Sequence, residues 1–142
     1  MTTTVAREST PPVTRRTDDW FLTSLAVAFG IVIVACHIES GLGRWQAAAW
    51  RYATGVPGSP ATWGVVILAA GLVLAYGQLR DDSRALRLGY RLTFWWFTVL
   101  CAAALLAMGH DLAEGTRQAN PIAPLAWFGF AYLYRSRWKS MR

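Results

Sequence analysis

The fold is decided by an uncharged apolar run at residues 20–38, WFLTSLAVAFGIVIVACHI. Its length is close to the roughly 20 residues that an α-helix needs to cross the hydrocarbon core of a bilayer. Two similar runs follow, TWGVVILAAGLVLAYGQL at residues 62–79 and LTFWWFTVLCAAALLAMG at residues 92–109. Together these runs predict an integral membrane protein built from transmembrane helices.

Composition supports this prediction. The chain has 142 residues, of which 54% are hydrophobic and 15% are charged, whereas a typical soluble domain has about 25% charged residues. A soluble domain of this size cannot bury so much apolar surface, because small domains need a large polar surface. The hydrophobic content also excludes a disordered chain, and two Cys residues are too few for a disulfide-rich scaffold.

A fourth, shorter apolar run is PIAPLAWFGFAYLY at residues 121–134. Prolines are tolerated in the first turn of a helix, and the span extends to residue 138 if Arg135 and Arg137 snorkel to the interface. We therefore expect an all-α, integral membrane four-helix bundle with spans at about 20–38, 62–79, 92–109 and 121–138. A re-entrant or surface helix is the alternative for the fourth run.

The remaining segments are polar or mixed. Residues 1–19 contain Thr, Ser and Pro-Pro and predict a flexible cytoplasmic tail before the transmembrane domain at 20–138. Residues 139–142 form a basic cytoplasmic end. The long connection at residues 39–61 has apolar residues at helical spacing and predicts a short amphipathic helix in the interface between spans one and two.

Basic residues predict the orientation of the spans. With four spans, 11 of the 14 Lys and Arg residues fall on one side, in the N-terminal tail, at residues 80–91 and at the C-terminus. The positive-inside rule then places both termini in the cytoplasm of a bacterium, with a multi-pass chain in the cytoplasmic (inner) membrane. These clusters suit contact with anionic lipid headgroups, and we expect membrane lipids and no nucleic acid among the partners.

Two sets of residues have simple roles in such a membrane protein. Tryptophans gather where spans meet the interfaces and predict anchors: Trp20, Trp45, Trp50, Trp63, Trp127 and Trp138. Small residues four apart predict close helix packing: Ala26 and Gly30, Gly71 and Ala75, Ala103 and Ala107. We expect a compact bundle that forms a homo-oligomer or binds another membrane protein.

Candidate ligands lie where two spans end at the same side. They are His37 and Glu39 at the end of the first span and His110, Asp111 and Glu114 after the third. Histidine and carboxylates bind divalent metals, and two histidines from separate helices can ligate haem. Polar residues also cluster there simply because helices leave the bilayer, so the expected cofactor is none, with a divalent metal or haem as alternatives.

The sequence contains no catalytic motif that we recognise, and we expect a protein that is not an enzyme. Asp81 and Asp82 lie among arginines, where solvated ion pairs account for them. Cys36 follows an apolar run and loosely matches a lipoprotein processing site, which leaves its lipidation open.

Three segments carry a resemblance in layout: ATWGVVILAAGLVLAYGQL, RLGYRLTFWWF and PIAPLAWFGFAYLY. They resemble small polytopic membrane proteins of actinobacterial phages and prophages. This resemblance implies a holin-like role, in which small proteins with a charged tail oligomerise into membrane lesions, or a superinfection-exclusion role. The alternatives are an accessory subunit that binds another membrane protein and a haem- or metal-binding bundle using His37 and His110.

Overall fold

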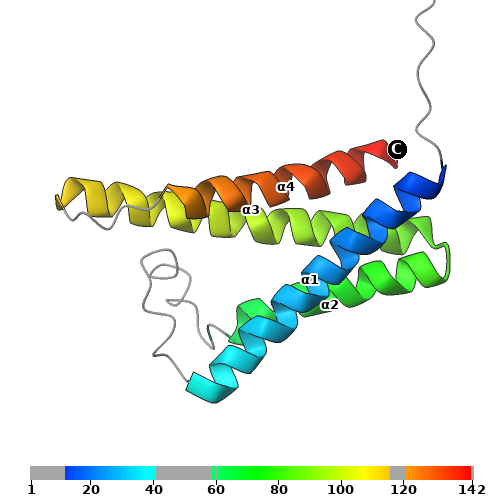
Figure 1. Cartoon of the computed structure of the whole chain (residues 1–142), viewed down its shortest axis with the longest axis horizontal. Helices are drawn as coiled ribbons and strands as arrows, with labels where there is room; N and C mark the ends of the chain where they lie inside the picture. The colour runs from blue at the N-terminus through cyan, green and yellow to red at the C-terminus, as the bar shows by residue number, and fades with distance from the viewer. Residues whose placement is uncertain (1–11, 41–58, 60, 116–120, 142) are drawn as a thin grey trace, which may run out of the picture.

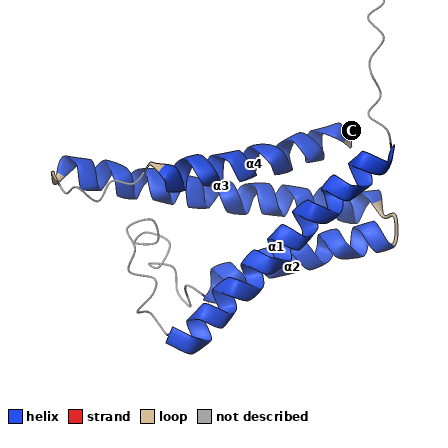
Figure 2. Ribbon diagram, viewed as in Figure 1, coloured by secondary structure: helices blue, strands red, loops and turns tan. Residues whose placement is uncertain are grey.

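The structure is a computed structural model that describes residues 12–40, 59, 61–115 and 121–141, with the backbone alone at 12–16 and 39–40. All regular structure in these residues is α-helical, as Figure 2 shows, so the expected all-α class is confirmed for them. The four helices are α1 (Pro12–Ser40), α2 (Ala61–Leu79), α3 (Ser83–Ala113) and α4 (Ile122–Ser140).

Three of the helices are long and apolar enough to cross a membrane: Thr17–Ile38 within α1, Ala61–Leu79 and Ser83–Ala113. The spans predicted at 20–38, 62–79 and 92–109 lie inside these three segments. Helix α4 does not reach the same apolar character, because Arg135, Arg137 and Lys139 occupy its last turns. The fourth helix exists, and its crossing of the bilayer stays a prediction.

Two helices extend beyond their predicted limits. Helix α1 begins at Pro12, so residues 12–19, which the sequence analysis assigned to the tail, are part of this helix. Proline is compatible with the start of a helix, and no later residue breaks it. Helix α3 begins at Ser83 because the Asp82 carboxylate caps it, accepting hydrogen bonds from the N–H groups of Arg84 (2.8 Å) and Ala85 (3.4 Å).

Other expectations lie outside the described residues. These are the tail at residues 1–11, the core of the amphipathic segment at 41–58, and the two tryptophans within it, Trp45 and Trp50.

Figure 1 shows how the helices are arranged. Helix α2 packs against both α1 and α3, and α4 packs along α3. The start of α1, the turn between α2 and α3, and the end of α4 gather at one end of the molecule, whereas the opposite ends of the α1/α2 pair and the α3/α4 pair diverge (Figure 1). We call the first of these the junction end and the second the open end.

The α1/α2 pair is held by close backbone approach at glycines. A Cβ atom added to Gly30 would lie only 2.5 Å from Leu68 Cβ and 2.7 Å from Leu68 Cα, and one added to Gly71 would lie 2.9 Å from the Val27 backbone nitrogen. Of the predicted packing residues, Ala26, Gly30, Gly71, Ala103 and Ala107 are buried, and Ala75 is half-buried. Such contacts matter in lipid, where helix association relies on van der Waals packing.

Helix α4 is held by aromatic rings instead. Phe97 of α3 is fully buried, and its ring contacts Trp127, Phe130 and Tyr134 of α4 at centroid distances of 5.8, 5.2 and 5.4 Å. Phe29 of α1 packs edge-on against Phe97 at 5.8 Å. Since each close aromatic pair contributes about 0.5–1.5 kcal/mol beyond its buried area, this cluster joins three helices.

We predict that Gly30→Ala lowers the free energy of unfolding by about 1–3 kcal/mol, because the new methyl group overlaps the Leu68 backbone and overpacks the interface. The matched control is Gly129→Ala, where an added Cβ meets nothing within 4 Å and the same change leaves stability equal or slightly raised. The measurement is loss of helical circular dichroism during SDS titration in mild detergent. Equal midpoints for the two variants would contradict the packing described here.

Candidate functional site

The junction end carries a polar network centred on Asp19 of α1. The Asp19 carbonyl oxygen accepts hydrogen bonds from Gln78 Nε2 of α2 at 2.8 Å and from Thr23 Oγ1 at 2.9 Å. The Gln78 amide also donates to Thr23 Oγ1 at 2.6 Å. These contacts fix the end of α2 against the start of α1.

The Asp19 side chain extends the network to the other two helices. Its Oδ1 atom accepts a hydrogen bond from the Tyr90 hydroxyl of α3 at 2.8 Å and lies 3.5 Å from Arg137 Nε of α4. The Arg137 Nη2 atom pairs with the neighbouring carboxylate of Asp18. We call Asp18, Asp19, Thr23, Gln78, Tyr90 and Arg137 the Asp19 junction, since all four helices meet there.

Burial makes this network energetically important. The Tyr90 side chain is fully buried, and the side chains of Asp19 and Arg137 are 17% and 21% exposed. Hydrogen bonds to a charged group in such surroundings contribute about 1.5–3 kcal/mol each. The arrangement holds the four helices in one register and places an Asp–Arg charge pair in largely buried surroundings.

Three of the predicted metal ligands lie close together at the C-terminal end of α3. Single ligand atoms of His110, Asp111 and Glu114 all lie within 4.8 Å of one another on the last turns of α3, and His110 Nδ1 is 3.3 Å from Glu114 Oε2. One imidazole and two carboxylates are a donor set that Zn²⁺ accepts. The other two predicted ligands, His37 and Glu39, belong to α1, and the side chain of Glu39 lies outside the described residues.

His37 and His110 lie near the ends of two different helices, α1 and α3. Helices α1 and α3 end on separate arms at the open end, as Figure 1 shows, and haem ligation by two histidines requires both imidazoles on one iron. We predict that the protein purified from a haem-producing host lacks a Soret absorption band. A band that disappears in both His37→Ala and His110→Ala would contradict this prediction.

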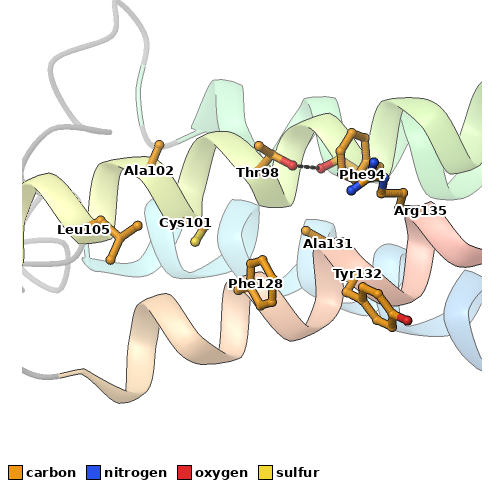
Figure 3. Close-up of a pocket in the computed structure, with 9 residues that line it drawn as sticks. All are labelled: Phe94, Thr98, Cys101, Ala102, Leu105, Phe128, Ala131, Tyr132 and Arg135. Carbon is orange, nitrogen blue, oxygen red and sulfur yellow. Dashed lines mark hydrogen bonds between the residues drawn. The ribbon is translucent and has the colours of Figure 1, made fainter.

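A groove follows the outer seam between α3 and α4. Its main part has a volume of about 330 Å³ and is shown in Figure 3, with Cys101 and Phe128 facing each other across the seam. A second part of about 290 Å³ continues towards the open end and shares Cys101, Leu105 and Phe128 with the first. We call both parts the α3/α4 groove. Its lining is mostly apolar, with the hydroxyl-bearing side chains of Thr98 and Tyr132 and with the Arg135 guanidinium at the junction end.

The predicted anchor tryptophans have mixed surroundings. Trp20 is exposed at the junction end, where an anchor is expected. The Trp63 carbonyl accepts a hydrogen bond from Trp96 Nε1 at 3.0 Å, and Trp127 belongs to the aromatic cluster. Trp138 lies under the Arg91 guanidinium, 5.7 Å from its ring centroid. Contacts within the bundle therefore contribute to the positions of Trp63, Trp127 and Trp138, in contrast to Trp20.

The Asp19 junction was not anticipated from the sequence. The sequence analysis placed Asp18 and Asp19 in a flexible tail and treated Arg137 as a snorkelling cation. A signal was present, because acidic, amide, phenolic and basic side chains flank the apolar runs at the ends that the charge rule assigns to one side. Successive helices of a four-span chain run in opposite directions, so the start of one span and the end of the next lie on the same side.

No protein-family model matches this chain, and neither the curated proteins nor the solved structures contain a match. Its function must therefore be inferred from its own residues.

We predict that Tyr90→Phe lowers the free energy of unfolding by about 1.5–3 kcal/mol, because it removes the hydroxyl that donates to the Asp19 carboxylate. The control is Tyr76→Phe, since Tyr76 is 56% exposed on α2 and surface changes cost less than about 0.5 kcal/mol. SDS titration followed by circular dichroism measures both. Identical stability of the two variants would show that the junction does not hold α3 in place.

Proposed function

We propose that this chain is a small, non-enzymatic integral membrane protein that acts by assembling in the bilayer. The observation that carries the proposal is the apolar character of its uncovered surface. In the most apolar window of each candidate span, only 28% of residues in α1, 39% in α2 and 33% in α3 are buried. The rest must be covered by lipid or by other helices.

The uncovered positions are consistently apolar. Within the three predicted spans that are apolar enough, the exposed residues are aliphatic, aromatic, Ala or Gly, with the exceptions Ser24, Thr62 and Tyr76. Large exposed side chains include Ile31 and Val32 on α1, Val65 and Leu72 on α2, and Leu106 on α3. A surface of this kind suits contact with acyl chains and with apolar helices of a second membrane protein.

The Asp19 junction supports the proposed orientation. It joins the start of α1, the end of α2, the start of α3 and the end of α4, and these are the ends where the basic residues concentrate. If the positive-inside rule applies, the junction end faces the cytoplasm and the open end faces outwards across the bacterial inner membrane.

Two forms of assembly are candidates. The holin-like form is a homo-oligomer that permeabilises the membrane, and the small size and basic C-terminal end support it. The accessory form, which includes a superinfection-exclusion protein, binds another membrane protein. The scarcity of exposed polar side chains in the described spans favours the accessory form, because a water-filled lesion needs a polar wall.

The test is induction of the full chain in a bacterial host, with the membrane potential followed by a voltage-sensitive dye and the membranes then cross-linked and solubilised in gentle detergent. We expect the chain to stay in the membrane pellet after alkaline washing and to cross-link either to itself or to one stoichiometric membrane protein. Gly30→Ala, which we expect to weaken α1/α2 packing, controls for the load of overproduced membrane protein.

The outcomes separate the two forms. A timed collapse of the potential together with a homo-oligomer supports the holin-like form. Normal growth with a stoichiometric partner supports the accessory form. A monomer without any partner, or a chain released by the alkaline wash, contradicts assembly in the bilayer.

A further inference from the structure

We propose that the α3/α4 groove binds one acyl chain of an anionic phospholipid, with the lipid phosphate held by Arg135. The inference rests on the proposed insertion in the membrane, and it assigns a defined lipid to a defined place on the chain. The argument has three parts: the shape of the groove, the state of its one cation, and the charges around its junction end.

The shape of the groove fits one lipid chain. On α3 the groove is lined from Phe94 to Met108, a distance of about 21 Å at the rise of an α-helix. This exceeds half of the roughly 30 Å hydrocarbon core, which is the depth of one leaflet. The groove walls are mostly apolar (Figure 3), and the Thr98 hydroxyl donates to the Phe94 carbonyl of its own helix. An acyl chain can therefore lie along the seam without leaving the hydrocarbon.

The cation at the junction end of the groove is available. Among the residues that the structure describes, Arg135 has no hydrogen-bond or ion-pair partner, and its side chain lies beside Phe94 at the end of the groove (Figure 3). Arg137, two residues further on, differs from Arg135, because its guanidinium forms ion pairs with Asp18 and Asp19. The carboxylates of the Asp19 junction therefore pair with Arg137, and the Arg135 guanidinium can bind an external anion.

Two further cations flank the same end. Arg91 is exposed and lies over the Trp138 ring, which itself contacts Phe94 at a centroid distance of 6.2 Å. Lys139 is exposed one turn beyond Arg135 on α4. A phosphate at Arg135 is thus next to a cationic surface at the depth where headgroups lie, and a basic residue near a membrane surface contributes about 1 kcal/mol to binding an anionic lipid.

Charge decides between the possible occupants. A transmembrane helix of a second copy would fill the apolar groove but would leave Arg135 without an anion. An anionic phospholipid satisfies both the apolar groove and the guanidinium, and the cytoplasmic leaflet of a bacterium supplies it. We therefore commit to the lipid, and a second copy becomes an outcome of the test.

The test is native mass spectrometry of the full chain, solubilised in mild detergent and titrated with palmitoyl-oleoyl phosphatidylglycerol or with the zwitterionic palmitoyl-oleoyl phosphatidylcholine. We expect one tightly retained phosphatidylglycerol. Arg135→Gln should reduce its apparent affinity about fivefold, the equivalent of about 1 kcal/mol. Arg84→Gln is the matched control, since it removes the same charge from an exposed site outside the groove lining at the same end.

A second variant tests the groove itself. Leu105 lines both parts of the groove and is 49% exposed. We therefore expect Leu105→Trp to obstruct the middle of the groove without disturbing the core of the bundle. We expect this variant to lose retained phosphatidylglycerol while its SDS-titration midpoint stays at the wild-type value.

Three results would overturn the proposal. They are an equal loss of lipid in Arg135→Gln and Arg84→Gln, equal retention of the two lipids by the wild type, and a lipid-free dimer that Leu105→Trp dissociates. A chain that leaves the membrane on alkaline washing instead refutes the proposed function on which the lipid site rests, so the two failures are distinguishable.

Discussion

The carboxylate and carbonyl of Asp19 receive hydrogen bonds from two other helices and lie beside a cation from the third. This matters because lipid provides no hydrophobic drive for helix association, so the position of each helix depends on packing and on polar contacts. The network lies at one end of the molecule, and the helices diverge from it towards the other end (Figure 1). The network also ties the junction ends of α3 and α4 to the same residue, because Tyr90 and Arg137 both contact the Asp19 carboxylate.

The α1/α2 pair and the α3/α4 pair are packed in two different ways. Glycines bring the backbones of α1 and α2 into direct contact, whereas large aromatic rings pack between α3 and α4. The groove lies on the α3/α4 seam, where its lining residues come from both of these helices.

The candidate sites differ in how far local sequence could reveal them. His110, Asp111 and Glu114 share one helix end, and their proximity follows from helical spacing. The pairing of His37 with His110 depended on the angle between α1 and α3, which residue patterns do not encode, and the two helices end on separate arms. The groove was also inaccessible to sequence reasoning, because its walls are ordinary apolar residues whose alignment depends on the register of two helices.

The sequence by itself determined that the chain is helical, that three of its segments are apolar enough to cross a membrane, and that its basic residues concentrate at particular helix ends. These are local properties, because hydropathy and helix length are sums over neighbouring residues. Only the tertiary structure decided which polar groups meet, since Asp19 and Tyr90 are 71 positions apart and Asp18 and Arg137 are 119 apart. The same contacts decided that Arg137 is bound within the bundle while Arg135, on the same helix, remains available to a ligand.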